Sequence, residues 1–342
     1  MNRPVKIALD SMGGDFAPAV LVKGAVLAQK EANGSFRIVL VGDADQIQEE
    51  LRKLGAESLP FIIQPASETI RMDDPAILSL KKKDSSIAVA MQMQKDGAVD
   101  AVVSAGHTGA VMTSALITLG RIEGISRPAI ATYLPTQKEQ DGVLVLDVGA
   151  NSECKARHLL EFGIMGSIYS ESVLNKTNPR VGLLSIGEES NKGNDLILSS
   201  HKLFLESSLN FVGNVEGNKI LKGSCDVVVC DGFVGNVMLK FAESIDGFLT
   251  SIVKKQIKQN LFSKLGILFL QASLRRLRKV LDYSEYGGAP LLGVNGVCIV
   301  AHGGSSPKAI KNAIKVAYQM SKKNVNIKIR EVLSSYWHRF RK

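Results

Sequence analysis

The chain has 342 residues, of which 45% are apolar and 22% are charged, and its formal net charge is +9. This composition is typical of a folded globular protein with one large or two medium domains, and it argues against a disordered chain. No apolar run approaches the roughly 18–20 residues of a membrane-spanning helix, and Asp10 interrupts the first apolar run too early for a signal peptide. The four cysteines, Cys154, Cys225, Cys230 and Cys298, lack paired zinc spacing. Because Cys225, Cys230 and Cys298 lie in or beside apolar runs, we expect buried free thiols and a reduced, cytoplasmic setting.

Short apolar runs alternate with stretches of helical periodicity. We expect strands at 5–10, 36–41, 60–63, 99–104, 128–133, 143–148, 181–186, 210–214, 226–230 and 296–301. We expect helices at 18–32, 43–54, 84–96, 109–119, 154–175, 193–207, 233–259 and 306–323. The alternation predicts an α/β fold with a mostly parallel sheet and helices on both faces, in which ligands bind at the carboxyl ends of strands.

Glycine-rich turns follow many of these strands. They are DSMGGD (10–15), SAGHTGA (104–110), DVGAN (147–151), IGEESNKGN (186–194), DGFVGN (231–236) and AHGGSS (301–306). Their shared position predicts that several strand ends converge on an anion site lined by backbone N–H groups. The motifs GxxxxGK[ST], GxGxxG, HExxH and GxSxG are absent, so nucleotide-binding, zincin and serine-hydrolase functions lack support.

The first of these turns places two glycines between two carboxylates. Bare carboxylates would repel a phosphate, so we expect Asp10 to fix a neighbouring loop or a cation. We expect Asp15 to cap the helix that Pro18 helps to start. Gly13 and Gly14 would let the backbone approach a ligand. The alternative is a purely structural strand-turn-helix connection.

Positive charge is concentrated in two places. Between Asp246 and Asp282 there are eight Lys or Arg residues and no acid, and the last 21 residues hold seven Lys or Arg against one Glu. Such patches attract anionic membranes or acidic proteins, whereas sparse aromatic residues disfavour nucleic acid.

The stretch 237–283 shows two amphipathic stripes joined by a basic and then apolar tip, which predicts a projecting helical hairpin. Two interpretations stay open: a pair of helices that forms a dimer, or a tip that binds anionic lipid. The membrane- or partner-binding candidates are Lys254, Lys255, Lys258, Leu265, Leu268 and Phe269.

The turns together resemble one known family. IALDSMGGDFAP, SAGHTGAVM, LDVGAN, RVGLLSIGEESNKGND, CDVVVCDGFVGNVMLK and YGGAPLLGVNGVCIVAHGGS, in this order, are similar to the phosphate acyltransferases of bacterial phospholipid synthesis, the PlsX family. The resemblance implies acyl transfer from acyl carrier protein to inorganic phosphate, with release of acyl phosphate and no cofactor or metal. It also implies a fold like that of phosphotransacetylases and isocitrate dehydrogenase-like enzymes, and a homodimer peripherally bound to the inner face of the cytoplasmic membrane. The sequence departs from the family at Ser152, Glu153, Ala156, Arg157 and Gly304.

The reaction suggests roles for particular residues. Phosphate is already anionic, so the site needs a cation and preorganised donors more than a strong base, and we expect direct transfer without a covalent enzyme intermediate. Lys192 is the candidate cation, with an ordinary exposed loop lysine as the alternative. His107 and His302 are candidate donors to phosphate or to the leaving sulfur, or simply capping residues. Asp231 is expected to orient a donor.

The phosphate- and substrate-binding candidates are mostly small polar residues in the same turns. In full they are Asp10, Gly13, Gly14, Asp15, Thr108, Asn151, Asn194, Asn236 and Ser305. Asn151 and Asn236 could equally serve only to form turns. A divalent ion near the aspartates stays open as well.

Two other functions compete with the acyltransferase. An oxidoreductase on the related dehydrogenase-like fold is disfavoured by the missing dinucleotide motif. A non-enzymatic scaffold could bind acyl chains or lipid through 247–283. We expect residues 1–342 to form one catalytic unit, of one or two lobes, that includes the hairpin at 237–283.

Overall fold

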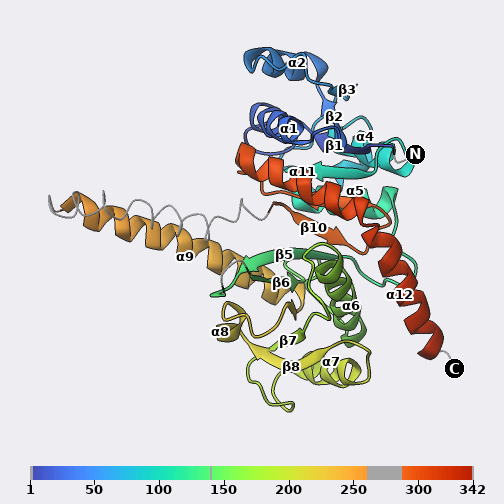
Figure 1. Ribbon diagram of the computed structural model, residues 1–342, viewed down its shortest axis with the longest axis vertical. Helices are drawn as coiled ribbons and strands as arrows, with labels where there is room; N and C mark the ends of the chain where they lie inside the picture. The colour runs from blue at the N-terminus through green and yellow to red at the C-terminus, as the bar shows by residue number, and fades with distance from the viewer. Residues whose placement is uncertain (1–2, 139–140, 260–286, 341–342) are drawn as a thin grey trace.

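The computed structural model describes residues 3–138, 141–259 and 287–340. They form one sheet in the order β3-β2-β1-β4-β11-β10-β5-β6-β9-β7-β8, with helices packed on both faces (Figure 1). The strands are β1 (Val5–Asp10), β2 (Phe36–Gly42), β3 (Ile62–Pro65), β4 (Ala101–Ser104), β5 (Ala129–Pro135), β6 (Gly142–Leu146), β7 (Val181–Ser185), β8 (Phe211–Glu216), β9 (Val227–Val229), β10 (Ala289–Leu292) and β11 (Val297–Val300).

The helices fill the connections between strands. They are α1 (Ala19–Glu31), α2 (Ala44–Lys53), α3 (Leu78–Lys81), α4 (Ser86–Lys95), α5 (Thr108–Thr118), α6 (Ala156–Ser172), α7 (Asp195–Leu205), α8 (Gly217–Ile220), α9 (Gly232–Gln259), α11 (Pro307–Lys322) and α12 (Val325–Phe340). Every expected strand and helix is present within three residues of its expected ends. The elements that the sequence did not predict are β10, α3, α8 and α12.

Strand direction changes in the middle of the sheet. Seven of the ten strand pairings are parallel, but β11–β10, β10–β5 and β5–β6 are antiparallel. As a result β6, β9, β7 and β8 run parallel to one another and opposite to β1, β4 and β11. The mostly parallel α/β sheet is confirmed, and it consists of two parallel halves of opposite direction.

The join between the two halves is narrow. Strand β10 pairs with β11 through its first two residues, Ala289 and Pro290, and with β5 through its last two, Leu291 and Leu292. By contrast, β1 and β2 share six register pairs.

Apolar side chains cover both faces of the sheet, as expected for strands with helices on each side. In β1, Ile7 and Leu9 belong to one buried cluster and Ala8 to the other, because successive side chains point to opposite faces. Helices α1 and α11 pack closely on the first face, where a methyl group on Gly24 would lie 2.6 Å from Cβ of Ile310. This close approach requires glycine at that position.

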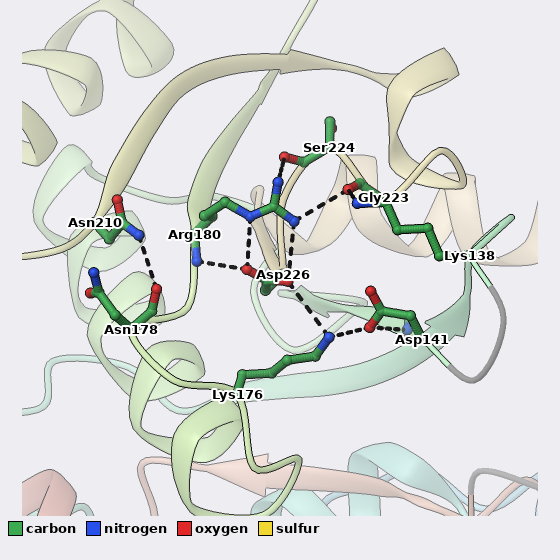
Figure 2. Close-up of polar contacts among 10 residues, drawn as sticks. Lys138, Asp141, Lys176, Asn178, Arg180, Asn210, Gly223, Ser224 and Asp226 are labelled. Carbon is green, nitrogen blue, oxygen red and sulfur yellow. Dashed lines mark hydrogen bonds and ion pairs between the residues drawn. The ribbon is translucent and has the colours of Figure 1, made fainter.

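A polar network fixes the amino ends of the second half (Figure 2). The Arg180 side chain donates to both carboxylate oxygens of Asp226, through Nε at 3.0 Å and through Nη2 at 3.3 Å, and its Nη1 donates to the Ser224 carbonyl at 2.7 Å. Lys176 bridges Asp141 and Asp226. Although burial opposes the effect, the hydrogen bonds from Arg180 lower the pKa of Asp226.

Helix α9 projects from the body of the molecule (Figure 1). Its exposed apolar side chains include Val237, Phe241, Ile245, Phe248 and Ile252, which recur every three or four residues along one face. The first arm of the expected hairpin is therefore present as a helix. Its tip and second arm, residues 260–283, lie outside the described residues.

Candidate active site

The glycine-rich turns fall into two groups. The first group follows the adjacent strands β1, β4 and β11 and comprises 10–15, 104–110 and 301–306. The second follows β6, β9 and β7 and comprises 147–151, 231–236 and 186–194. In the first group the 10–15 turn contacts both other turns, and in the second group 147–151 contacts 231–236. The two sets of strands run in opposite directions, so their carboxyl ends lie at opposite edges of the sheet. Convergence of all six turns on one site stays a prediction.

A buried carboxylate holds the first group together. The Ser104 hydroxyl donates to Asp10 Oδ2 at 2.6 Å and accepts the N–H of Gly106 at 3.0 Å. Burial raises the pKa of Asp10, which is fully enclosed. A methyl group on Gly13 would lie 2.5 Å from that carboxylate, and Gly14 has a φ of 109°. Both glycines are thus required by the turn itself.

The second carboxylate of this turn is exposed. The Asp15 N–H donates to the Gly303 carbonyl at 3.0 Å, and both carboxylate oxygens lie 3.3 Å from where a Cβ on Gly303 would be. The expectation that Asp15 caps the following helix is wrong: Pro18 is the N-cap of α1, without a side-chain bond. The carboxylate is directed toward the 301–306 turn instead.

Both candidate histidines accept a backbone N–H. The Nδ1 of His107 accepts from Ala110 at 3.2 Å and caps α5, and the Nδ1 of His302 accepts from Gly304 at 3.1 Å. In a neutral ring the proton is then on Nε2, so each histidine can present one N–H donor. Of the neighbouring candidates, Thr108 is exposed and Ser305 is buried.

A second buried aspartate organises the other group. Asp147, the residue after β6, accepts five hydrogen bonds at 2.7–3.2 Å. The donors are the N–H groups of Ile130, Gly149, Ala150 and Asn151 and the side-chain amide of Asn151. Burial raises the pKa of Asp147, and these donors oppose the shift. The Asn151 side chain also donates to the Pro128 carbonyl at 2.7 Å, which ties the turn to the start of β5.

The turn that opens α9 packs directly on this aspartate. A Cβ on Gly235 would lie 1.8 Å from the Asp147 carbonyl oxygen, so no other residue fits there. The Asn236 side chain lies beside Gly149, with its Oδ1 3.6 Å from where a Cβ would be. Asp231 caps α9 by accepting the Val234 N–H at 3.0 Å. Asn236 and the buried Asn151 therefore belong to two turns that pack against each other.

The third turn of this group presents the candidate cation. The main chain of Lys192 is held by the Ser185 hydroxyl and the Asn214 amide, which donate to its carbonyl at 3.2 and 3.4 Å. Its side chain is exposed. Asn194 accepts the Ile197 N–H at 3.0 Å and caps α7. Lys192 thus stands on an anchored loop at the end of β7, which pairs with β9.

The thiols near the second group are not nucleophiles. Burial, then the charges of Asp147 and Asp231, raise the pKa of Cys154 to about 12. The same causes raise the pKa of Cys230. Because the thiolate is the reactive form, both side chains stay protonated and inert near neutral pH.

Sequence reasoning missed Asp147 as an organising residue. The signal was available, because Asp147 follows an apolar strand and precedes a glycine turn in the way that Asp10 does. Asp10 and Asp15 belong to the first group of turns and Asp231 to the second. In the part of the chain that the structure describes, no group of three or more His, Cys, Asp or Glu side chains is placed to hold a metal ion.

The structure describes only some of the membrane- or partner-binding candidates. Lys254, Lys255 and Lys258 lie on α9, and Lys255 is exposed. Leu265, Leu268 and Phe269 lie outside the described residues. Among the described helices, none combines the length and apolar character needed to cross a bilayer.

Comparison with known proteins now decides the family. A family model described as "Fatty acid synthesis protein" matches residues 5–328. The chain belongs to this family. Its curated relatives include a phosphate acyltransferase from Heliobacterium modesticaldum, 52% identical over 96% of this chain and 97% of the relative. Another, from Synechococcus elongatus, is 49% identical over 94% and 92%. The expected family and reaction class, acyl transfer to phosphate in lipid synthesis, are confirmed.

Solved structures support the expected fold. A phosphotransacetylase from Streptococcus pyogenes has a TM-score of 0.63 at 17% identity, over 94% of this chain and 95% of its own. The EutD phosphotransacetylase from Staphylococcus aureus has a TM-score of 0.61 at 15% identity, over 93% and 94%. The likeness to phosphotransacetylases is thus confirmed at the level of the fold.

Proposed function

We propose that the chain transfers an acyl group from acyl carrier protein to inorganic phosphate, and that the second group of turns binds the phosphate. The observation that carries the second part is the position of Lys192, since no other lysine or arginine lies in the six turns. Lys192 is exposed in a turn that also exposes Glu188 and Glu189, whereas the first group presents the carboxylate of Asp15 beside Gly303 and no lysine or arginine. A phosphate dianion is attracted to a lysine cation and repelled by a carboxylate.

The acids of the second group differ in their engagement: Glu188 is ion-paired with Lys219 at 3.1 Å, and Glu189 is exposed in the same turn as Lys192. Asp147 is buried and its oxygens already accept five hydrogen bonds. Asp231 accepts a helix N–H and is half-buried. Their main effect is to hold two glycine turns in place. Because the backbone N–H groups of the 147–151 turn already have partners, the groups that we assign to a tetrahedral anion are the side chains of Asn236 and Lys192.

In this mechanism a phosphate oxygen attacks the thioester carbonyl. An O–C bond forms, a tetrahedral intermediate carries the negative charge, and the C–S bond breaks to release a thiolate that takes a proton from water. Lys192 orients the phosphate and offsets the charge, and Asn236 donates to phosphate or oxyanion. The protonated thiol of Cys154 supports direct transfer, since it offers no competing nucleophile.

The first group of turns receives a different proposed role. Its Gly13 and Gly14 backbone, His107 and Ser305 suit the neutral amides and hydroxyls of the carrier's prosthetic arm better than an anion. His107 would donate through Nε2.

The reaction is tested by incubating the purified chain with phosphate and palmitoyl-acyl carrier protein. We expect palmitoyl phosphate and free carrier thiol in equal amounts, with no product when phosphate is omitted. Release of free fatty acid alone, at a rate independent of phosphate, would contradict the proposal.

Membrane and self-association are proposed from helix α9. Its exposed apolar stripe is unusual for a monomer, and its cations Lys254, Lys255 and Lys258 precede the apolar tip. We propose a homodimer that binds the inner face of the cytoplasmic membrane peripherally. Leu268→Glu with Phe269→Glu should abolish sedimentation with anionic vesicles, and Phe241→Glu should shift the mass in light scattering. Unchanged sedimentation and mass would reject these roles.

A further inference from the structure

Three exposed cations gather at the start of α6. They are Arg127, Lys155 and Arg157, all exposed, and Arg157 keeps 52% of its side chain accessible despite an ion pair. Two of them, Lys155 and Arg157, flank the first residue of the helix. We call these three residues the α6 basic patch.

The patch adjoins the second group of turns directly. Strand β5 begins next to the end of β6, where Ala131 pairs with Leu146. Arg127 precedes Pro128, whose carbonyl accepts the Asn151 side chain at 2.7 Å. Lys155 follows the 147–151 turn by four residues. The order of strands therefore places the patch on one flank of the turns and Lys192, beyond β9, on the other.

A buried carboxylate preorganises this surface. Glu161 is fully buried in α6 and accepts the Ser126 N–H at 2.7 Å, the Ser126 hydroxyl at 2.8 Å and Arg157 Nε at 2.8 Å. One side chain thus fixes both the segment that carries Arg127 and the guanidinium of Arg157. Such anchoring reduces the conformational entropy lost when a partner binds.

The charges of all three patch residues affect the same side chain, His158. His158, within the same turn of helix, has its pKa lowered by burial and by the charges of Arg127, Lys155 and Arg157, although Glu161 opposes them. In the segments 120–127 and 152–158 the exposed acids are Glu123 and Glu153, while Glu161 is buried and paired with Arg157. The exposed cations of these segments, Arg121, Arg127, Lys155 and Arg157, outnumber the exposed acids, so their accessible charge is net positive.

Several other cations of the described structure are held by partners outside the second group of turns. On α12 and the turn before it, Lys323, Lys328 and Arg330 donate to Asn175, Ser172 and Asn295. Lys311 and Lys315 are ion-paired with Glu31, and Arg180 with Asp226. The sequence had pointed to the basic carboxyl-terminal segment as one docking patch, but the α6 basic patch is the one beside the proposed site.

We propose that the α6 basic patch docks an acidic carrier protein so that its thioester reaches the second group of turns. The proposal rests on the proposed function, since it assigns the donor's docking surface for that same site. Charge complementarity selects an acidic protein as the occupant, and the short separation from Asn151 suits a donor whose reactive group must reach the turns.

The primary test is direct binding of fluorescently labelled acyl carrier protein, measured by anisotropy at low and high salt. Arg127→Glu with Lys155→Glu should weaken binding at least tenfold at low salt and remove most of its salt dependence. The matched control is Lys23→Glu with Lys30→Glu on α1, which makes the same charge change on exposed residues in the other half and should leave binding within twofold.

A kinetic arm separates docking from chemistry. With palmitoyl-acyl carrier protein, the α6 double variant should raise KM at least tenfold and change kcat less than twofold. Glu161→Gln, which loosens the anchor while keeping its shape, should raise KM by a smaller factor. Unchanged carrier binding in the α6 variant overturns the proposal, as does an effect confined to sedimentation with anionic vesicles.

The carrier-binding measurement and the activity measurement test different proposals and can fail independently of each other. Loss of carrier affinity in a protein that makes no acyl phosphate would refute the proposed function and keep the docking surface. Normal acyl phosphate formation with unchanged carrier affinity in the variant would support the proposed function and refute the docking surface.

Discussion

The two groups of turns are built alike and charged differently. In each, a buried aspartate at a strand end, Asp10 or Asp147, binds backbone and side-chain donors and fixes a glycine turn. At the surface, the first group presents Asp15 and no lysine or arginine, whereas the second presents Lys192 together with Glu188 and Glu189. The same device can therefore support different ligands, and the single lysine, rather than the glycine pattern, is the reason to assign the anion to the second group.

The largest expected effect comes from removing the exposed charges of the two groups one at a time. Lys192→Met should lower kcat/KM by about 10²–10³, in the range for loss of one transition-state donor. Asp15→Asn should change kcat/KM less than threefold. Lys202→Met, an exposed lysine on α7, controls for loss of charge. Steady-state formation of acyl phosphate measures all three, and a larger loss for Asp15→Asn would reverse the assignment.

A pair of glycines in one helix probes the contact between turns. Gly235→Ala would force a methyl group onto the Asp147 carbonyl and should reduce kcat/KM more than tenfold and the free energy of unfolding by about 3 kcal/mol. Gly247→Ala, also in α9, meets no heavy atom within 4 Å and should stabilise the helix by about 0.5–1 kcal/mol. Denaturant unfolding and activity assays compare them. Equal behaviour would show that the turns can separate without loss.

The two buried aspartates should differ in their contribution to stability. Asp147→Asn replaces an acceptor of five hydrogen bonds by one oxygen and an N–H₂ group, so buried donors lose partners, at a cost of about 1–3 kcal/mol. Asp10→Asn keeps one oxygen for its nearest donor, Ser104, and should cost less. Urea denaturation at neutral pH ranks the two, and a greater loss for Asp10→Asn would contradict the geometry.

The smallest expected effect on catalysis comes from replacing Arg180, which lies at the amino ends of the strands in the second half of the sheet. Arg180→Met should lower stability by about 1–3 kcal/mol near neutral pH while leaving kcat/KM within twofold. The folded-state pKa of Asp226 is depressed, so the stability it contributes is present above its usual value of 3.8 and is lost as pH falls through the folded pKa. The difference between wild type and variant should shrink below pH 4. A constant difference from pH 7 to pH 3 would exclude this linkage.

Local patterns predicted most elements and failed where distant contacts decide. Strand β10 is a four-residue run after two glycines, and nothing near it shows that it pairs with both β11 and β5. The reversal of direction therefore escaped prediction, and with it the division of the turns. Helix α12 could have been found, because Val325, Ile329 and Leu333 recur every four residues and are fully buried.

The residues of the candidate site stay a prediction, whereas the structure shows how the turns that carry them are arranged. Lys192, Asn151 and Asn236 were named from the glycine turns after apolar strands together with the family resemblance. The capping role first expected for Asp15 failed because its carboxylate is turned toward a loop nearly 290 residues away, at Gly303. Arg127 gave no local signal, since its place beside the turns comes from strand pairing.

The narrow join at β10 has a mechanical consequence. Two register pairs on each side resist shear less than the six that connect β1 to β2. Torsion between the two blocks of sheet should concentrate there, so amide hydrogens of Leu291 and Leu292 should exchange with solvent deuterium faster than those of Ile7 and Leu9, even though all four side chains are almost completely buried.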